Sequence, residues 1–216
     1  MSPFQAARRL RGIEKSVIRQ LFDRARPGSI NLGLGEPDLP TPDVIRRAAV
    51  HVITEEQNGY TSHAGLPALR ERIAAEYGQL GLTPERVITT AGSQEALYLA
   101  LMTLVDEGDE VLLPDPGFVA YPTIVRMAGG QPVYYRLPAA QDFGFDVEEF
   151  RRGLTSRTKV VVCISPSNPT GRTISRDQVS AMAAALAGTD VYAISDEIYR
   201  ELYYSTQSPE SIASFY

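Results

Sequence analysis

The sequence predicts an α/β protein built on a doubly wound, mainly parallel sheet with flanking helices. Short apolar runs with β-branched residues, such as 159–164 and 191–194, recur between residues 86 and 199. Near-continuous runs of this kind are typical of strands that are covered on both faces. Segments with helical spacing of apolar residues separate these runs, and a repeated strand–helix order favours a parallel sheet.

The first forty residues predict a helix followed by a loop. Residues 1–28 are expected to form an amphipathic helix that breaks at Pro27-Gly28, because apolar residues recur there at helical spacing. These residues are Leu10, Ile13, Val17 and Leu21. Residues 30–38 hold too many glycines and prolines for a regular element, so we expect a loop. We therefore divide the chain into residues 1–40 and 41–216.

The elements of the second part follow from apolar periodicity and from start and stop residues. A helix is expected from Thr41 to about Thr54, with Thr41 as N-cap and Pro42 at the first helical position. Further helices are expected around 69–77 and 97–104, and at 121–128, 146–154 and 175–187. Strands are expected at 87–90, 109–113, 132–137, 159–164 and 191–194.

Composition argues against several classes of function. The net charge of −5 disfavours a sequence-independent nucleic-acid binder. Cys163 is the only cysteine, so no disulfide can form within the chain, and the two histidines, His51 and His63, make a metal site unexpected. No apolar run is long enough for a bilayer and no signal peptide is visible, so we expect a soluble protein of a reducing compartment, the cytoplasm.

The end of the last predicted strand carries the first candidate site residues. The apolar run 191–194 stops at Ser195-Asp196, and Tyr199 follows three residues later. In an open α/β sheet, ligands bind beyond the carboxyl ends of strands, so Asp196 is expected to face a crevice. A carboxylate there can hold the proton of a ring nitrogen, as pyridoxal phosphate chemistry requires. The alternative is a solvated Asp196 that caps the next segment.

Three other strand ends predict binding loops. Residues 91–94, Ala-Gly-Ser-Gln, lie between a predicted strand and a helix, and a helix amino terminus after a glycine turn can bind an anion. Phe118 follows another strand in a proline-rich turn, where its flat face suits a flat ring, although core filling is the alternative. Ser165–Gly171, with the sequence Ser-Pro-Ser-Asn-Pro-Thr-Gly, is the most specific motif in the chain. Asn168 in this motif is a candidate binding residue, and the alternative is that Asn168 only closes a turn.

Taken in order, these motifs resemble the class I/II aminotransferases, which are fold-type I pyridoxal phosphate enzymes. Two loops nearer the amino terminus fit the same resemblance: the Gly-Glu-Pro-Asp loop at Gly35 and the turn at Tyr60. Taken alone, Gly35 fits a plain turn equally well and Tyr60 fits a packing residue. The resemblance covers about residues 30–199, and plausibly the chain to residue 216.

The resemblance implies a role for each motif. Gly92, Ser93 and Gln94 would hold the phosphate of pyridoxal 5′-phosphate. Phe118 would stack on the pyridine ring. Asn168 and Tyr199 would donate hydrogen bonds to the phenolic oxygen. Asp196 would pair with the ring nitrogen, so that Asp196 and Tyr199 count as catalytic. The amide of Gly35 would approach the substrate carboxylate. Tyr60 would reach the cofactor phosphate of a neighbouring subunit, which implies a homodimer.

The resemblance also implies that part of the active site lies outside this sequence. Family members carry the cofactor on a lysine further along the chain, whereas the only lysines here are Lys15 and Lys159. Residues 41–216 are thus expected to form the amino-terminal part of the large, cofactor-binding domain. We expect an aminotransferase that uses an amino acid and a 2-oxo acid. The alternatives are a non-catalytic or partner-dependent fragment and a carbon–sulfur lyase of the same fold.

Overall fold

The computed structural model describes residues 7–11, 13–15, 17–26, 28–30, 32–33, 35, 37–56, 58–204 and 208–215. The chain divides into two compact units, one within residues 13–89 and the other within residues 1–12 and 90–216. Pro27 of the predicted break and Glu36 of the predicted loop lie outside the described residues. Of the helices that the structure describes, none has the length and apolar character needed to span a bilayer.

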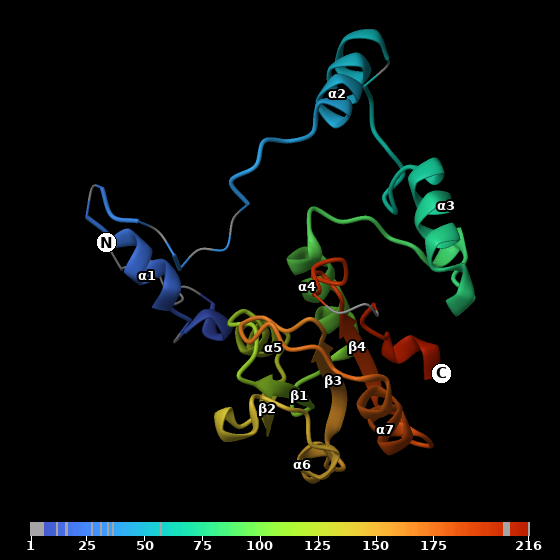
Figure 1. Ribbon diagram of the computed structural model, residues 1–216. Helices are drawn as coiled ribbons and strands as arrows, with labels where there is room; N and C mark the ends of the chain where they lie inside the picture. The colour runs from blue at the N-terminus through green and yellow to red at the C-terminus, as the bar shows by residue number, and fades with distance from the viewer. Residues whose placement is uncertain are drawn as a thin grey trace. The chain divides into compact units, whose positions relative to one another are not determined.

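The unit within residues 13–89 is helical (Figure 1). Its elements are α1 (Val17–Asp23), α2 (Asp43–Glu55), α3 (Pro67–Glu76) and the short 3-10 helices Gly78–Leu80 and Pro84–Arg86. The prediction of one helix over residues 1–28 is wrong, because the 3-10 helix Arg8–Leu10 and α1 are separated by non-helical residues 11 and 13–15. Arg11 has an extended backbone, with φ −70° and ψ 129°, which ends the 3-10 helix.

Two further details of this unit correct the sequence-based prediction. The N-cap of α2 is Pro42, not Thr41, and no side chain caps the helix. Residues 87–90, predicted as a strand, pair with no strand in the described structure. Their backbone groups have other partners: Arg70 Nε donates to the Val87 carbonyl at 2.9 Å, and the Thr89 N–H donates to the Ala64 carbonyl at 3.0 Å.

The second unit contains a four-stranded parallel sheet with the order β2-β1-β3-β4 (Figure 1). Its strands are β1 (Glu110–Asp115), β2 (Gln131–Arg136), β3 (Thr158–Ile164) and β4 (Tyr192–Asp196). Each overlaps a predicted strand. The chain adds β2 on one side of β1, and then β3 and β4 on the other side, so the strand order reverses between β1 and β3.

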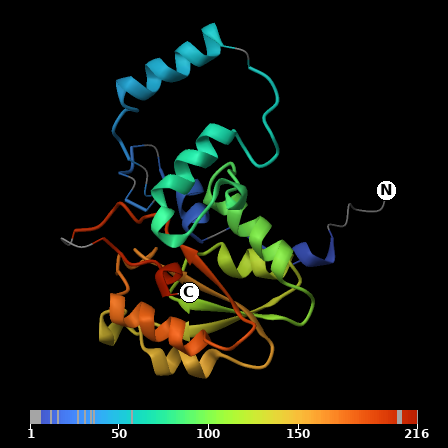
Figure 2. The ribbon, with the colours of Figure 1, turned by 90° about the vertical axis from the view of Figure 1, so that its right-hand side faces the viewer.

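Helices cover both faces of this sheet (Figure 2). On one face lie α4 (Ser93–Leu104) and α5 (Tyr121–Met127); on the other lie α6 (Val147–Gly153), α7 (Arg176–Leu186) and the 3-10 helix Ile212–Phe215. A 3-10 helix, Ala139–Gln141, follows β2. Alternate residues of β3 belong to opposite clusters, Val160 and Val162 to the first and Val161 and Cys163 to the second. Burial on both faces explains why β3 is a continuous apolar run.

The helices on the second face begin with side-chain caps. Ser175 and Gln178 form a reciprocal capping box at α7, and Asp146 accepts hydrogen bonds from the first-turn amides of α6. These caps fix where the chain leaves the loops that follow β2 and β3.

The parallel sheet with helices on both faces confirms the doubly wound α/β fold. The loops after β1, β3 and β4 meet at one edge of the sheet, next to the point where the strand order reverses. Folds of this kind bind ligands there.

Candidate active site

Asp196 is the last residue of β4 and is only 8% exposed. Its carboxylate accepts two hydrogen bonds, one from the Tyr121 hydroxyl at 2.7 Å and one from the Ile198 backbone N–H at 3.3 Å. A buried carboxylate needs such partners, because burial without them is costly. The geometry therefore favours a fixed acceptor at the end of the sheet over a solvated Asp196 that only caps the next segment.

Tyr121 is a site residue that the sequence did not reveal. It is the first residue of α5 and is 1% exposed. Burial and the adjacent Asp196 carboxylate raise the pKa of Tyr121 above its ordinary value of 10.0, so its hydroxyl stays protonated and donates. The only signal in the sequence is its position three residues after Phe118.

Phe118 lies in the turn between β1 and α5. Its ring packs edge-on against Tyr121, with ring centres 5.5 Å apart and planes at 85°. The turn is tight: a Cβ on Gly117 would lie 2.5 Å from the Pro114 carbonyl oxygen, and the Tyr121 N–H donates to the Phe118 carbonyl at 3.1 Å. Phe118 is half-buried and also packs against the apolar cluster on this face of the sheet.

The loops after β3 and β4 bring Asn168 and Tyr199 together. Asn168 Nδ2 donates to the Tyr199 hydroxyl at 3.4 Å, a long hydrogen bond. The loop that holds Asn168 is closed by its own backbone, since the Gly171 N–H donates to the Ser167 carbonyl at 2.7 Å. Ser165 Oγ also accepts from the Ile174 N–H at 3.0 Å. Both amide and phenol are thus held at the edge of the sheet where Asp196 lies.

The amino terminus of α4 presents Gly92, Ser93 and Gln94, all of them exposed. Gly92 has φ +98°, a conformation that favours glycine, and a Cβ there would meet no atom within 4 Å. The amides of the first turn have no carbonyl partner within their own helix, and the helix dipole adds positive potential. This arrangement can bind an anion such as a phosphate.

The remaining predicted residues belong to other elements of the chain. Gly35 and Tyr60 belong to the unit within residues 13–89, and the Tyr60 side chain is fully exposed there. Lys15, in the same unit, forms an exposed ion pair with Asp23 at 2.8 Å. Lys159 lies near the start of β3, at the opposite end of the strands from Asp196, with its ammonium 5.6 Å from the centre of the Tyr192 ring. In the described part of the chain, no cluster of three or more His, Cys, Asp or Glu could hold a metal.

Comparison with known proteins decides the family. The profile of the aminotransferase class I and II family matches residues 27–216. The chain belongs to this family. An aspartate aminotransferase of Geobacillus stearothermophilus is 40% identical over 187 residues, which cover 85% of this chain and 48% of that protein. The chain thus spans about half the length of the curated relatives it matches, and the resemblance inferred from the motifs is confirmed.

Solved structures of family members agree with the fold. The structure of aspartate aminotransferase from Thermus thermophilus with maleate has a TM-score of 0.93 and 34% identity, covering 98% of this chain and 58% of that one. Alanine aminotransferase from Pyrococcus furiosus has a TM-score of 0.88 and 32% identity, covering 98% and 56%. The sheet and flanking helices of this chain are therefore those of the aminotransferase fold.

Proposed function

We propose that the complete protein is a pyridoxal phosphate-dependent aminotransferase, which moves an amino group from an amino acid to a 2-oxo acid. The observation that carries the proposal is the buried Asp196 carboxylate, held by Tyr121 at the sheet edge that Phe118, Asn168 and Tyr199 share. Together with the amino terminus of α4, these side chains make four kinds of group. Each kind would suit one part of a phosphorylated pyridine: the carboxylate the ring nitrogen, the aromatic ring the flat face, the amide and phenol the phenolic oxygen, and the helix terminus the phosphate. That match supports the cofactor.

Each side chain has a distinct task in this proposal. Asp196 keeps a proton on the ring nitrogen, because an adjacent negative charge favours the protonated form. Phe118 offers its apolar face to the ring, and Asn168 and Tyr199 donate to the phenolic oxygen. The amides of Ser93 and Gln94 bind the phosphate, which Gly92 lets approach closely. When bound, pyridoxal phosphate supplies an electron sink for the carbon that loses a proton.

The covalent link to the cofactor has to come from another lysine. Lys159 lies at the opposite end of β3 from Asp196, and Lys15 forms an ion pair with Asp23 in the other compact unit, so we propose neither as the carrier of the cofactor. Residues 1–216 alone are therefore expected to bind pyridoxal phosphate weakly and reversibly. Borohydride reduction followed by peptide mass mapping tests this expectation. Stoichiometric labelling of Lys15 or Lys159, together with transamination, would contradict it.

The substrate is proposed from the relatives, several of which are named aspartate aminotransferases. The assay is oxaloacetate formation from aspartate and 2-oxoglutarate by the complete protein. Asp196→Ala is expected to reduce turnover at least about a hundredfold, since preorganised charges usually contribute more to catalysis than any other effect. Asp190→Ala, which changes an exposed carboxylate, is the control. Equal turnover by both variants would refute the role of Asp196.

Two alternatives are separated by their products and by mass. A carbon–sulfur lyase of the same fold would release a thiol, pyruvate and ammonia from cystathionine, without transfer of an amino group to a 2-oxo acid. A non-catalytic or partner-dependent fragment is favoured by the lack of a suitably placed lysine among Lys15 and Lys159. An intact mass near 23.7 kDa would support the fragment, and about twice that mass would support the enzyme.

We also propose a cytoplasmic homodimer. The full exposure of Tyr60 supports it, because its hydroxyl is available to the cofactor phosphate of a second subunit. Sedimentation tests the dimer, and mixing tests the shared site. Subunits with Tyr60→Phe and subunits with Asp196→Ala should recover activity when combined, since one site of the mixed dimer then has both residues. Failure to recover, in a dimer shown to exchange subunits, would exclude a shared site.

A further inference from the structure

Ser165 lies between two parts of the candidate active site. The residue directly follows β3 and is only 8% exposed. Its backbone N–H donates to the Asp196 carbonyl at 3.2 Å, and its hydroxyl oxygen accepts from the Ile174 N–H at 3.0 Å. The first bond joins the end of β3 to the end of β4. The second bond joins the two ends of the loop that carries Asn168, so Ser165 is bonded to both parts of the site.

The Ser165 hydroxyl lies on the face of the sheet opposite to the Asp196 carboxylate. Its partner Ile174 packs against the second apolar cluster, whereas Tyr121, which donates to Asp196, belongs to the first. Side chains two residues apart along a strand share a face, and Cys163 of the second cluster precedes Ser165 by two residues. Ser165 can therefore fix the loop without touching a ligand that Asp196 binds.

The loop between Ser165 and Ile174 is also closed within itself. The Ser167 N–H donates to the Arg172 carbonyl at 2.8 Å, and the Gly171 N–H donates to the Ser167 carbonyl at 2.7 Å. The chain position of Asn168 lies inside both of these bonds. Because the inner bonds maintain the shape of the loop, the bond at its base sets the tilt of the whole loop relative to β3.

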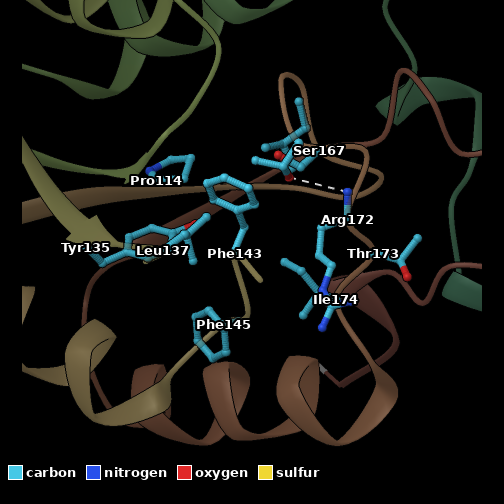
Figure 3. Close-up of a pocket in the computed structure, with 11 residues that line it drawn as sticks. Pro114, Tyr135, Leu137, Phe143, Phe145, Ser167, Arg172, Thr173 and Ile174 are labelled. Carbon is cyan, nitrogen blue, oxygen red and sulfur yellow. Dashed lines mark hydrogen bonds between the residues drawn. The ribbon is translucent and has the colours of Figure 1, made fainter. Parts of the chain in front are cut away.

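Two other features around the loop hold it less firmly. A cavity of about 20 Å³ lies beside the loop, and Ser167, Thr170 and Ile174 contribute to its lining (Figure 3). Side chains that border a void lose dispersion contacts on that side. Arg172 pairs with Asp142 at 2.8 Å, but both side chains are exposed, and exposed ion pairs contribute little because water screens them. The tilt of the loop therefore depends on the partly buried bond at its base.

We propose that Ser165 is a positioning residue of the candidate active site, whose hydroxyl holds the loop at the tilt that keeps Asn168 beside Tyr199. The inference rests on the proposed function, in which Asn168 and Tyr199 donate to the phenolic oxygen of pyridoxal phosphate. The distance from Asn168 Nδ2 to the Tyr199 hydroxyl, 3.4 Å, is long for a hydrogen bond, so a small rotation of the loop would break it. Ser165→Ala keeps the backbone bond to Asp196, so its effect is confined to the Asn168 side of the site.

The test measures the Kd of the complete protein for pyridoxal phosphate by fluorescence. Ser165→Ala should raise the Kd about three- to tenfold, the equivalent of one hydrogen bond, and Ser165→Cys, which keeps a weaker acceptor of similar size, should give an intermediate value. Ser156→Ala, a matched change at an exposed serine, should change the Kd by no more than about twofold. Equal Kd values for wild type and Ser165→Ala would overturn the role of Ser165, whereas a wild type that binds no pyridoxal phosphate would refute the proposed function itself.

A double-mutant cycle separates positioning from a general loss of stability. In an Asn168→Ala background, Ser165→Ala should change the Kd by no more than about twofold, because its effect passes through Asn168. In a Tyr121→Phe background, Ser165→Ala should keep its full effect, because Tyr121 holds Asp196 from the other face of the sheet. A full effect of Ser165→Ala in both backgrounds would overturn the proposal.

Amide hydrogen exchange tests the same inference without cofactor. In Ser165→Ala, the Ile174 amide loses its acceptor and should exchange at least about threefold faster. The Gly171 amide, which is bonded inside the loop, should exchange at the wild-type rate within about twofold, because the loop changes its tilt and keeps its shape. Faster exchange of both amides would mean that the loop unfolds, and an unchanged rate at Ile174 would mean that the Ser165 hydroxyl does not hold the loop. Either result would overturn the proposal.

Discussion

Replacing Tyr121 with phenylalanine tests whether its hydroxyl holds Asp196. The change removes one buried hydrogen bond of 2.7 Å to a carboxylate and keeps the ring that packs against Phe118. Hydrogen bonds to charged groups contribute about 1.5–3 kcal/mol, so Tyr121→Phe should lower the free energy of unfolding by that amount at pH 7. Tyr134→Phe, at a half-exposed ring on β2, is the control and should cost less than about 0.5 kcal/mol.

The dependence on pH gives a sharper criterion. The pKa of Tyr121 is raised in the folded protein, so its stabilisation is complete below the unfolded pKa of about 10 and is lost above it. Each pH unit above 10 should therefore reduce the difference between wild type and Tyr121→Phe by about 1.4 kcal/mol. Burial also raises the pKa of Tyr135, and that of Cys163 to about 12, but these groups are common to both proteins and cancel.

The assay is urea unfolding of both proteins at intervals between pH 8 and pH 11. Unfolding is monitored by a circular dichroism signal to which tyrosine ionisation does not contribute. The reasoning also predicts weaker binding of pyridoxal phosphate by Tyr121→Phe, because the Asp196 carboxylate is less firmly placed. Two results would refute it: equal stability of the two proteins at pH 7, or a stability difference that stays constant from pH 9 to pH 11.

Two further substitutions test other parts of the scaffold. Gly117→Ala should cost about 1–3 kcal/mol of unfolding free energy and weaken cofactor binding, because its Cβ would lie 2.5 Å from the Pro114 carbonyl oxygen; urea unfolding and cofactor fluorescence measure both effects. Glu110→Gln should cost about 1.5–3 kcal/mol at pH 7, because the buried Glu110 carboxylate accepts from Thr155 at 2.5 Å and from Arg157. The Thr155 bond and Arg157 lower the pKa of Glu110 below 4.5, so the difference should shrink as pH falls below 4.5.

Exposed positions supply the controls for these two variants. Gly78→Ala places a Cβ in open space and should leave stability unchanged or slightly raised, since alanine restricts the unfolded chain. Glu107→Gln changes an exposed carboxylate, so the free energy of unfolding should depend on pH below pH 4.5 as it does in the wild type. A Gly117→Ala variant as stable as Gly78→Ala would contradict the tight turn. A stability difference for Glu110→Gln that stays constant from pH 6 to pH 3 would contradict the assigned ionisation.

The sequence predicted the sheet well because its strands are buried on both faces. β3 is a continuous apolar run, and such runs can be located without knowledge of tertiary structure. The segment 87–90, Val-Ile-Thr-Thr, is also rich in β-branched residues, but the Thr89 amide and the Val87 carbonyl bind Ala64 and Arg70, which composition does not encode. The starts of α6 and α7 were predicted at the residues that cap them, whereas at α2 the chain enters the helix at Pro42 rather than Thr41.

The candidate site divides in the same way. Asp196 was predictable because it ends a strand, and Asn168 because its loop has a distinctive local sequence. Tyr121 was not predictable, since its hydroxyl is defined by a partner 75 residues away in the chain. Long-range pairings of single polar atoms leave no periodic trace in a sequence.

The separation between Tyr121 and Asp196 has a consequence for biosynthesis. At roughly 5–20 residues per second, a ribosome needs roughly 4–15 seconds to make the 75 residues that separate the two partners. During that interval α5 and β2 are synthesised, while the acceptor for the Tyr121 hydroxyl does not yet exist. The Tyr121 hydroxyl can find its partner only when β4 has been made. In the proposed function, Asp196 can therefore bind pyridoxal phosphate only after β4 has been made and Tyr121 has found its acceptor.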